Sequence, residues 1–158
     1  METATITQLI DADIDTVWAQ ITDVTALENW HPGVREVDLL SEAKTGVGAT
    51  RRCNFYDGSD VREEVIESGP HAMRIRITGF KAPMKHFESA WSVRSTDSGA
   101  TQLTVQMEYE MKFGVLGTVM NLLVVQGRMP RLIGKVLRGL DRHIATGEAI
   151  GQDFEAAA

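Results

Sequence analysis

Apolar and polar residues alternate strictly along the stretch from Thr101 to Phe113. The apolar side of this alternation contains Leu103, Val105, Met107, Tyr109, Met111 and Phe113. A two-residue period predicts a long strand with one apolar face and one solvated face. Because methionine thioethers fit irregular shapes better than branched side chains do, this face suits the wall of a cavity. A plain hydrophobic core is the alternative interpretation.

The period changes after Gly114. Apolar residues then recur at helical spacing, which predicts a long helix from about Val115 to Gly147 that Pro130 kinks or interrupts. Its first part, Val115–Val125, is apolar on every side, and one sheet face cannot cover it. We expect the uncovered side to meet a ligand, a portal loop, a second subunit or a membrane.

The N-terminal part combines a strand with two short helices. Alternating residues rich in β-branched side chains predict a strand over Thr3–Ile10. Apolar residues at helical spacing predict an amphipathic helix over Ile14–Val24, capped by Asp11 or Asp13. A second, shorter helical segment ends at Pro32.

Turn residues at short, regular intervals divide the central part of the chain into six further strands. We predict them near Val34–Ser41, Gly48–Tyr56, Asp60–Ser68, His71–Gly79, Met84–Thr96 and Ala100–Phe113. Connections this short make neighbouring strands antiparallel. The predicted fold class is α+β: a curved seven-stranded antiparallel sheet wraps around a long C-terminal helix, with two short helices after the first strand.

Length and charge limit the classes of function. A chain of 158 residues predicts one domain, over residues 1–150, with a flexible tail over 151–158. The net charge of −6 opposes binding to nucleic acid. The single Cys53 excludes an internal disulfide. We find no signal peptide and no apolar stretch of roughly 18 residues, and expect a cytoplasmic protein.

Two motifs carry a resemblance to a known superfamily. The first is Val17-Trp18-Ala19-Gln20-Ile21-Thr22-Asp23, followed by Leu27 and Trp30-His31-Pro32; the second is Gly46-Val47-Gly48-Ala49-Thr50-Arg51, followed by Asp57-Gly58 and Glu63. Together with the order of elements, they resemble the START-like, Bet v 1-like superfamily (SRPBCC), which has the helix-grip fold. The resemblance is closest to its polyketide cyclase/dehydrase and lipid-transport branch.

The resemblance implies hydrophobic ligand binding. We expect binding or transport of a lipid, isoprenoid or polyketide in a cavity between the sheet and the C-terminal helix, entered near Gly79–Pro83 and the start of that helix. An enzyme of the polyketide cyclase/aromatase or dehydratase type is the alternative, and a protein-interaction module acting through the apolar helix segment is a third. The sequence offers no convincing catalytic base, so binding is favoured over catalysis.

Arg51 and Glu63 form the best polar pair. Each shares the more apolar face of its strand, and a turn at Asp57-Gly58 makes them near cross-strand partners. A charge on a cavity wall must be paired or solvated, so we interpret them as an ion pair that orients a ligand. A structural salt bridge at the sheet margin is the alternative. If the protein is an enzyme, Arg51, Glu63 and Tyr109 are the candidate catalytic residues.

The remaining candidates surround the expected cavity. The predicted ligand-binding residues are Arg51, Phe55, Glu63, Met73, Phe87, Trp91, Leu103, Val105, Met107, Tyr109, Met120 and Leu123. The alternative is that these side chains fill the interior completely.

The four histidines, His31, His71, His86 and His143, lack the short spacing of metal ligands, and we expect partly exposed surface residues and no metal or cofactor. A general acid/base role for His31 or His86 is the alternative. A basic stripe at Arg128, Arg131, Lys135, Arg138 and Arg142 fits a solvated helix face, or a transient membrane contact. A homodimer through the same helix is a further possible partnership.

Overall fold

A computed structural model describes residues 1–112, 114, 116, 119 and 126–154. Its elements, in chain order, are β1 (Glu2–Ile10), α1 (Ile14–Thr22), α2 (Leu27–Trp30), β2 (Val34–Leu39), β3 (Thr50–Phe55), β4 (Asp60–Ser68), β5 (Ala72–Thr78), β6 (Met84–Ser95), β7 (Thr101–Met111) and α4 (Gln126–Thr146). The seven strands form one antiparallel sheet in the order β1-β7-β6-β5-β4-β3-β2. The predicted fold class is therefore confirmed.

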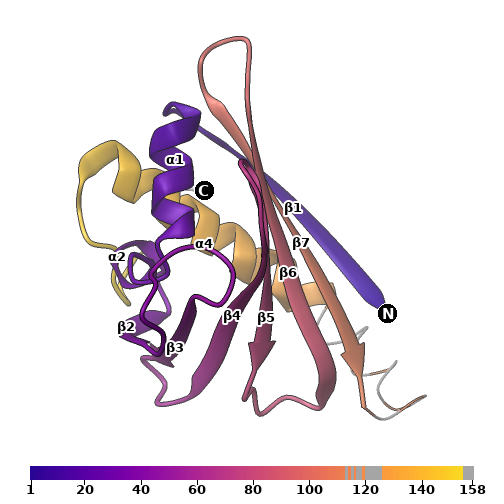
Figure 1. Cartoon of the computed structure of the whole chain (residues 1–158). Coiled ribbons are helices and arrows are strands. Elements are labelled where there is room, and N and C mark those ends of the chain that lie inside the picture. Colours follow the sequence, from indigo (N-terminus) through magenta and orange to yellow (C-terminus); the bar gives the residue numbers. More distant parts are fainter. Residues whose placement is uncertain (113, 115, 117–118, 120–125, 155–158) are drawn as a thin grey trace.

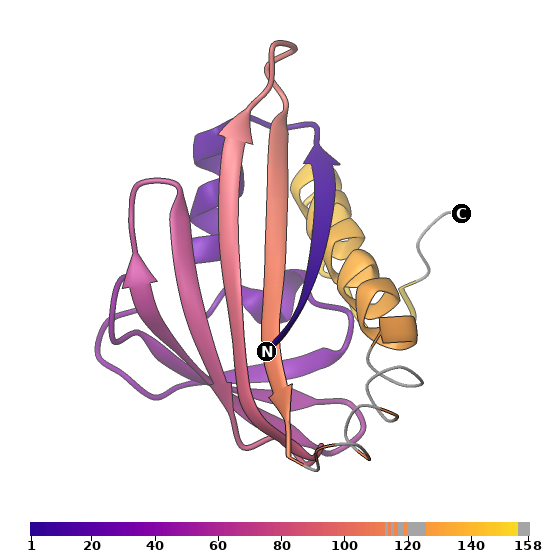
Figure 2. The same cartoon turned by 90° about the vertical axis from the view of Figure 1, so that its right-hand side faces the viewer.

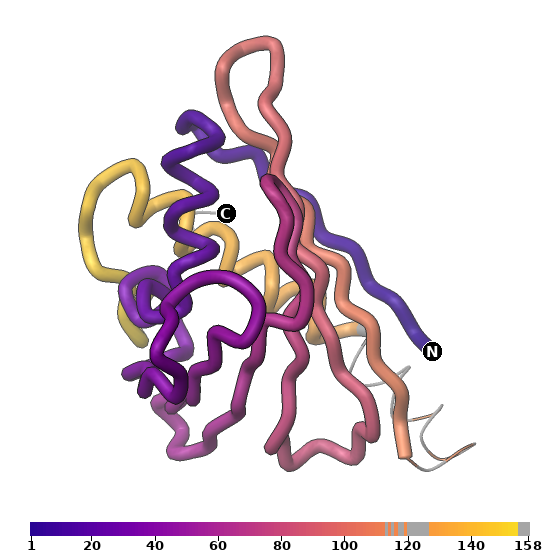
Figure 3. The backbone as a smooth tube through the Cα atoms, viewed as in Figure 1, coloured from indigo at the N-terminus to yellow at the C-terminus, as the bar shows by residue number. Residues whose placement is uncertain are grey.

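The helices α1, α2 and α4 lie on one side of the sheet (Figure 1). In the view turned by 90°, the strands stand in front, α1 lies behind them and α4 lies beside β1 (Figure 2). α4 packs against β1 and α2, whereas α2 also contacts β2, at the other edge of the sheet. The backbone trace shows that the sheet is curved, with β2 and β3 lying near α2 and away from β1 (Figure 3). The helices and the curled sheet together enclose an interior.

Local chemistry explains where α1 begins. Asp13 caps α1, since its carboxylate accepts a hydrogen bond from the backbone N–H of Thr16 at 3.2 Å. Of the two caps considered from sequence, Asp13 is thus the one used. The sequence predicted that Pro130 would kink or interrupt the long helix; α4 continues through Pro130, so the helix is not interrupted there. The proline removes one backbone donor, but burial of Leu137 and Leu140 on the same helix outweighs that loss.

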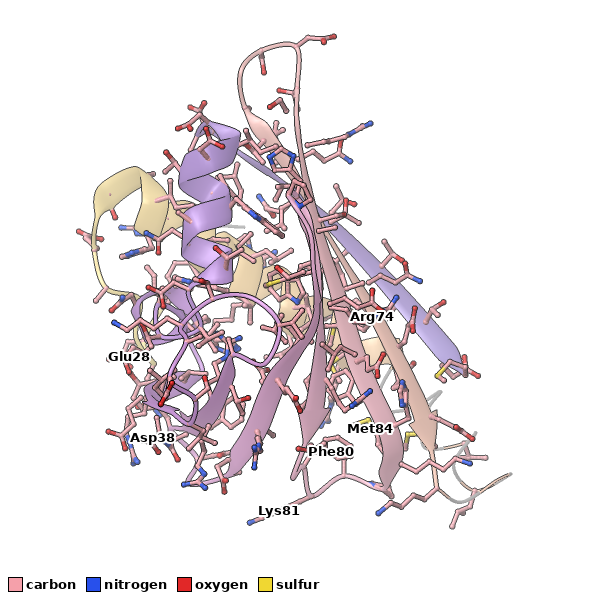
Figure 4. The ribbon with its side chains drawn as sticks, viewed as in Figure 1. Glu28, Asp38, Arg74, Phe80, Lys81 and Met84 are labelled. Atoms are coloured by element: carbon pink, nitrogen blue, oxygen red, sulfur yellow. The ribbon has the colours of Figure 1, made fainter. Side chains whose placement is uncertain are left out.

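The alternation along β7 is confirmed. Its odd-numbered residues from Thr101 to Tyr109 are all buried, and they face the helices. The opposite face carries charges: the guanidinium of Arg74 on β5 lies 2.9 Å from Glu108 on β7 and 3.4 Å from Glu88 on β6. Arg74 points away from the helices (Figure 4). Among the described residues, no helix is long and apolar enough to cross a membrane.

Candidate functional site

A cavity of about 600 Å³ lies between the inner face of the sheet and the helices. Its lining comes from α2 and the residues after it, from β3 to β7, and from α4. The apolar side chains in it include Leu27, Phe55, Val61, Ile75, Ile77, Phe87, Trp91, Met107, Met129, Leu132, Ile133 and Val136. The lining has fewer polar side chains. Three of them are His31, on the segment after α2, and Arg51 and Glu63, on the paired strands β3 and β4.

Arg51 and Glu63 face each other on β3 and β4. The Nε and Nη2 atoms of Arg51 lie 2.7 and 2.5 Å from the same carboxylate oxygen, Oε2 of Glu63. Its Nη1 donates to the carbonyl of Val24 at 2.9 Å. The Arg51 side chain is 5 % exposed and that of Glu63 is 19 % exposed. The predicted cross-strand partnership is confirmed, and the buried cation is neutralised within the protein.

Cys53 lies beside this ion pair on the same face of β3. Burial raises the pKa of its thiol well above the usual range, and the nearby Glu63 carboxylate acts in the same direction. The thiol is therefore uncharged at neutral pH and is a poor nucleophile. Cys53 contributes a small, weakly polar group to the interior.

His31 follows α2 and lines the cavity with its ring against Phe55, at a centroid distance of 6.1 Å. Burial lowers the pKa of its imidazole to about 4, an effect that Glu63 opposes and Arg51 reinforces. The ring is therefore neutral at pH 7. Its Nδ1 accepts a hydrogen bond from the backbone N–H of Gly33 at 3.0 Å, which assigns the proton to Nε2. His31 thus brings an N–H donor to the cavity.

A close approach between α2 and α4 holds His31 near the cavity. A Cβ atom at Gly139 would lie 2.5 Å from the carbonyl oxygen of Trp30 and 3.2 Å from Cδ of Pro32. Only glycine allows the two helices to come this close. After α4, the backbone N–H of Ile150 donates to the carbonyl of Asn29 at 2.9 Å, which ties the C-terminal segment to α2.

Six of the predicted ligand-binding residues lie together in the cavity lining: Arg51, Phe55, Glu63, Phe87, Trp91 and Met107. Leu103 and Val105 are buried in the hydrophobic core beyond that lining. Met73 belongs to the same core and lines a separate hollow of about 440 Å³. Tyr109 is buried in a small cluster with Met84. Met120 and Leu123 are outside the described residues, as is most of the apolar segment Val115–Val125.

Sequence reasoning missed several lining residues. Ile75 and Ile77 share the inner face with Met73, and Ser89 lies between Phe87 and Trp91 on that face of β6, so strand alternation could have found all three. His31 lines the cavity, and not only the outer surface as expected from its lack of a pairing motif. Within the part of the chain that the structure describes, no group of three or more metal-ligating side chains occurs.

The geometry just described is that of the helix-grip fold, and the chain belongs to the family described as polyketide cyclase / dehydrase and lipid transport, which matches residues 1–145. No curated protein matches the chain by sequence.

Solved structures share the fold at low identity. An uncharacterised protein from Bacillus thuringiensis has 18 % identity and a TM-score of 0.72, covering 91 % of this chain and 99 % of its own. A START superfamily protein from Mycobacterium smegmatis has 16 % identity and a TM-score of 0.70, covering 90 % and 98 %. The di-domain ARO/CYC BexL from the BE-7585A biosynthetic pathway has 13 % identity and a TM-score of 0.77, covering 92 % of this chain and 47 % of its own.

Proposed function

We propose that this protein binds a small, largely apolar molecule, of the lipid, isoprenoid or polyketide class, in the cavity between the sheet and α4. The observation that carries the proposal is the cavity itself, about 600 Å³ in volume and lined mainly by apolar side chains around one polar cluster. Ligand sites in proteins have this size and this composition. Membership of a family whose description includes lipid transport supports the same function.

The entrance follows from the exposed part of the lining. Asp57 in the β3–β4 turn, Leu132 on α4 and Gln152 after α4 line the cavity and are exposed to solvent. Residues 79–83, near which the sequence placed the entrance, do not line it. We therefore place ligand entry between the β3–β4 turn and α4.

Binding can be tested with a neutral environment-sensitive dye such as Nile red. Saturable fluorescence enhancement with one site per chain, reversed by a long-chain isoprenoid or aliphatic competitor, is the expected result. Native mass spectrometry of protein purified from its host should detect a bound molecule directly. A protein that neither binds the dye saturably nor carries a small molecule is not a ligand carrier.

A second function, catalysis of the cyclase/dehydratase type, would use the same cavity. The observation in its favour is that His31 and Glu63 line one apolar site: the neutral imidazole N–H can donate a hydrogen bond to a substrate carbonyl, and the carboxylate can accept a proton. Tyr109, the third catalytic candidate from sequence, is not in the lining. Incubation with a poly-β-carbonyl substrate should then give a cyclised or dehydrated product that Glu63→Gln no longer forms. Unchanged substrate with the wild-type protein rejects this function.

A further inference from the structure

The positive charge at the polar end of the cavity, the Arg51 guanidinium, is already paired with groups of the protein itself. Three nitrogen atoms of Arg51 contact Glu63 or the carbonyl of Val24. The guanidinium is buried, and its counter-charge lies on the adjacent strand. A ligand carboxylate arriving here would meet the negative charge of Glu63 without a free cation to bind. In a low-dielectric interior, such like charges repel strongly.

Hydrogen-bonding capacity, by contrast, remains at this end. Both Arg51 nitrogens that contact Glu63 bind Oε2, and among the described residues no N–H or O–H reaches Oε1. The Cys53 thiol is the other polar group beside this carboxylate, and it is a weak donor that a ligand hydroxyl can replace. The neutral ring of His31 carries a proton on Nε2, because Nδ1 is the acceptor for Gly33. One acceptor and one donor are the complement of a hydroxyl group, which both donates and accepts.

The other charges of the lining lie at the open side. Lys135 on α4 is half-buried, and Asp57 in the β3–β4 turn is exposed, so this side carries one charge of each sign. A ligand carboxylate could pair with the Lys135 ammonium only at the open side of the cavity. Its apolar tail would then fill the interior and leave Oε1 of Glu63 without a polar partner.

We infer that the cavity selects an apolar molecule with a hydroxyl group at one end, and discriminates against the corresponding carboxylate. The hydroxyl donates to Oε1 of Glu63 and accepts from Nε2 of His31, while the apolar body lies against Phe87, Trp91 and Met107. This inference rests on the proposed binding function and names the chemistry of its ligand.

Two probes of equal chain length test the inference on the unmodified protein. At pH 7.5, 1-dodecanol should displace Nile red with an affinity roughly tenfold above that of dodecanoate, as expected when a buried polar group would otherwise stay unpaired. Dodecane serves as the probe without a head group and should bind less tightly than the alcohol. Binding of the carboxylate as tight as that of the alcohol overturns the inference, and so does an alcohol no better than the alkane. Absence of displaceable dye binding instead rejects the proposed function itself.

Variants assign the discrimination to particular side chains. Glu63→Gln removes the negative charge and frees the Arg51 cation, so dodecanoate should gain affinity relative to 1-dodecanol. If this variant does not fold, His31→Asn provides the test, because the Asn amide can still accept from Gly33 but no longer reaches as far as Nε2. The alcohol should then lose its advantage over dodecane. His71→Asn is the matched control, since His71 is exposed and does not line the cavity. If the affinity of 1-dodecanol relative to that of dodecane changes equally in both His variants, the assignment to His31 is contradicted.

Discussion

Arg51 on β3 and Glu63 on β4 are paired directly across the two strands, and two guanidinium nitrogens share one carboxylate oxygen. A buried ion pair is a weak source of net stability, but removing one member is costly because it leaves the other uncompensated. The pair therefore sets the polarity of the cavity more than it strengthens the fold.

This asymmetry gives a prediction for single and double variants. Glu63→Gln should lower the free energy of unfolding by about 3 kcal/mol, because Arg51 is buried and loses its counter-charge. Arg51→Met should cost less, since Glu63 is partly exposed to water. In urea unfolding, the double variant should show a coupling energy on the order of 0.5–3 kcal/mol. Strict additivity of the two single effects contradicts the pairing.

The pH dependence of stability should reveal the lowered pKa of the buried His31 imidazole. The pKa of His31 is about 4 in the folded protein and near 6.5 in the unfolded chain. Between these two values the imidazole is protonated in the unfolded state and neutral in the folded state. The free energy of unfolding should therefore fall as the pH drops from about 6.5 to about 4, by at most about 3 kcal/mol, and this contribution should level off below pH 4. Stability at pH 7 keeps the full benefit of the neutral ring.

Carboxylates also titrate near pH 4, so His31→Asn is the reference for this measurement. The difference in the free energy of unfolding between wild type and variant isolates the contribution of the histidine. This difference should narrow as the pH falls from about 6.5 to about 4. Parallel stability curves for the two proteins would show that His31 is solvated and charges normally. His71→Asn, on the exposed surface, should follow the wild-type curve.

Two glycines of α4 should respond in opposite ways to the same substitution. Gly139→Ala places a methyl group 2.5 Å from the Trp30 carbonyl oxygen, and should destabilise the protein by roughly 1–3 kcal/mol while weakening ligand binding. Gly127→Ala meets no atom of the described residues within 4 Å and should stabilise the helix by up to about 1 kcal/mol. Thermal unfolding of both variants compares them directly. Equal effects would mean that α2 and α4 are not in close contact at Gly139.

The sequence predicted the strands, and the register of β3 against β4, because both depend on local chemistry. The turn at Asp57-Gly58 and the alternation on either side of it suffice to bring Arg51 opposite Glu63. Alternation identifies which face a residue occupies, but not how far along the strand the cavity extends. Tyr109 and Met107 share the inner face of β7, yet the curvature of the sheet puts Met107 in the cavity lining and Tyr109 in another cluster.

The position of His31 could not be predicted in the same way. It depends on the contact between α2 and α4, which a glycine at position 139 permits more than 100 residues later in the chain. Neither its burial nor its lowered pKa has a local signal, because both arise from elements that meet only in the folded protein.

Filling the cavity should abolish binding without unfolding the protein. Val61 on β4 is half-buried and lines the cavity, so Val61→Phe occupies space that a ligand needs. Val47 is 66 % exposed in the β2–β3 loop and does not line the cavity, which makes Val47→Phe a control with the same change in size. We expect Nile red affinity to fall at least tenfold in Val61→Phe and to stay unchanged in Val47→Phe, the fall corresponding to about 1.4 kcal/mol. Circular dichroism should confirm that both variants are folded. Undiminished binding in a folded Val61→Phe variant would place the ligand elsewhere on the molecule.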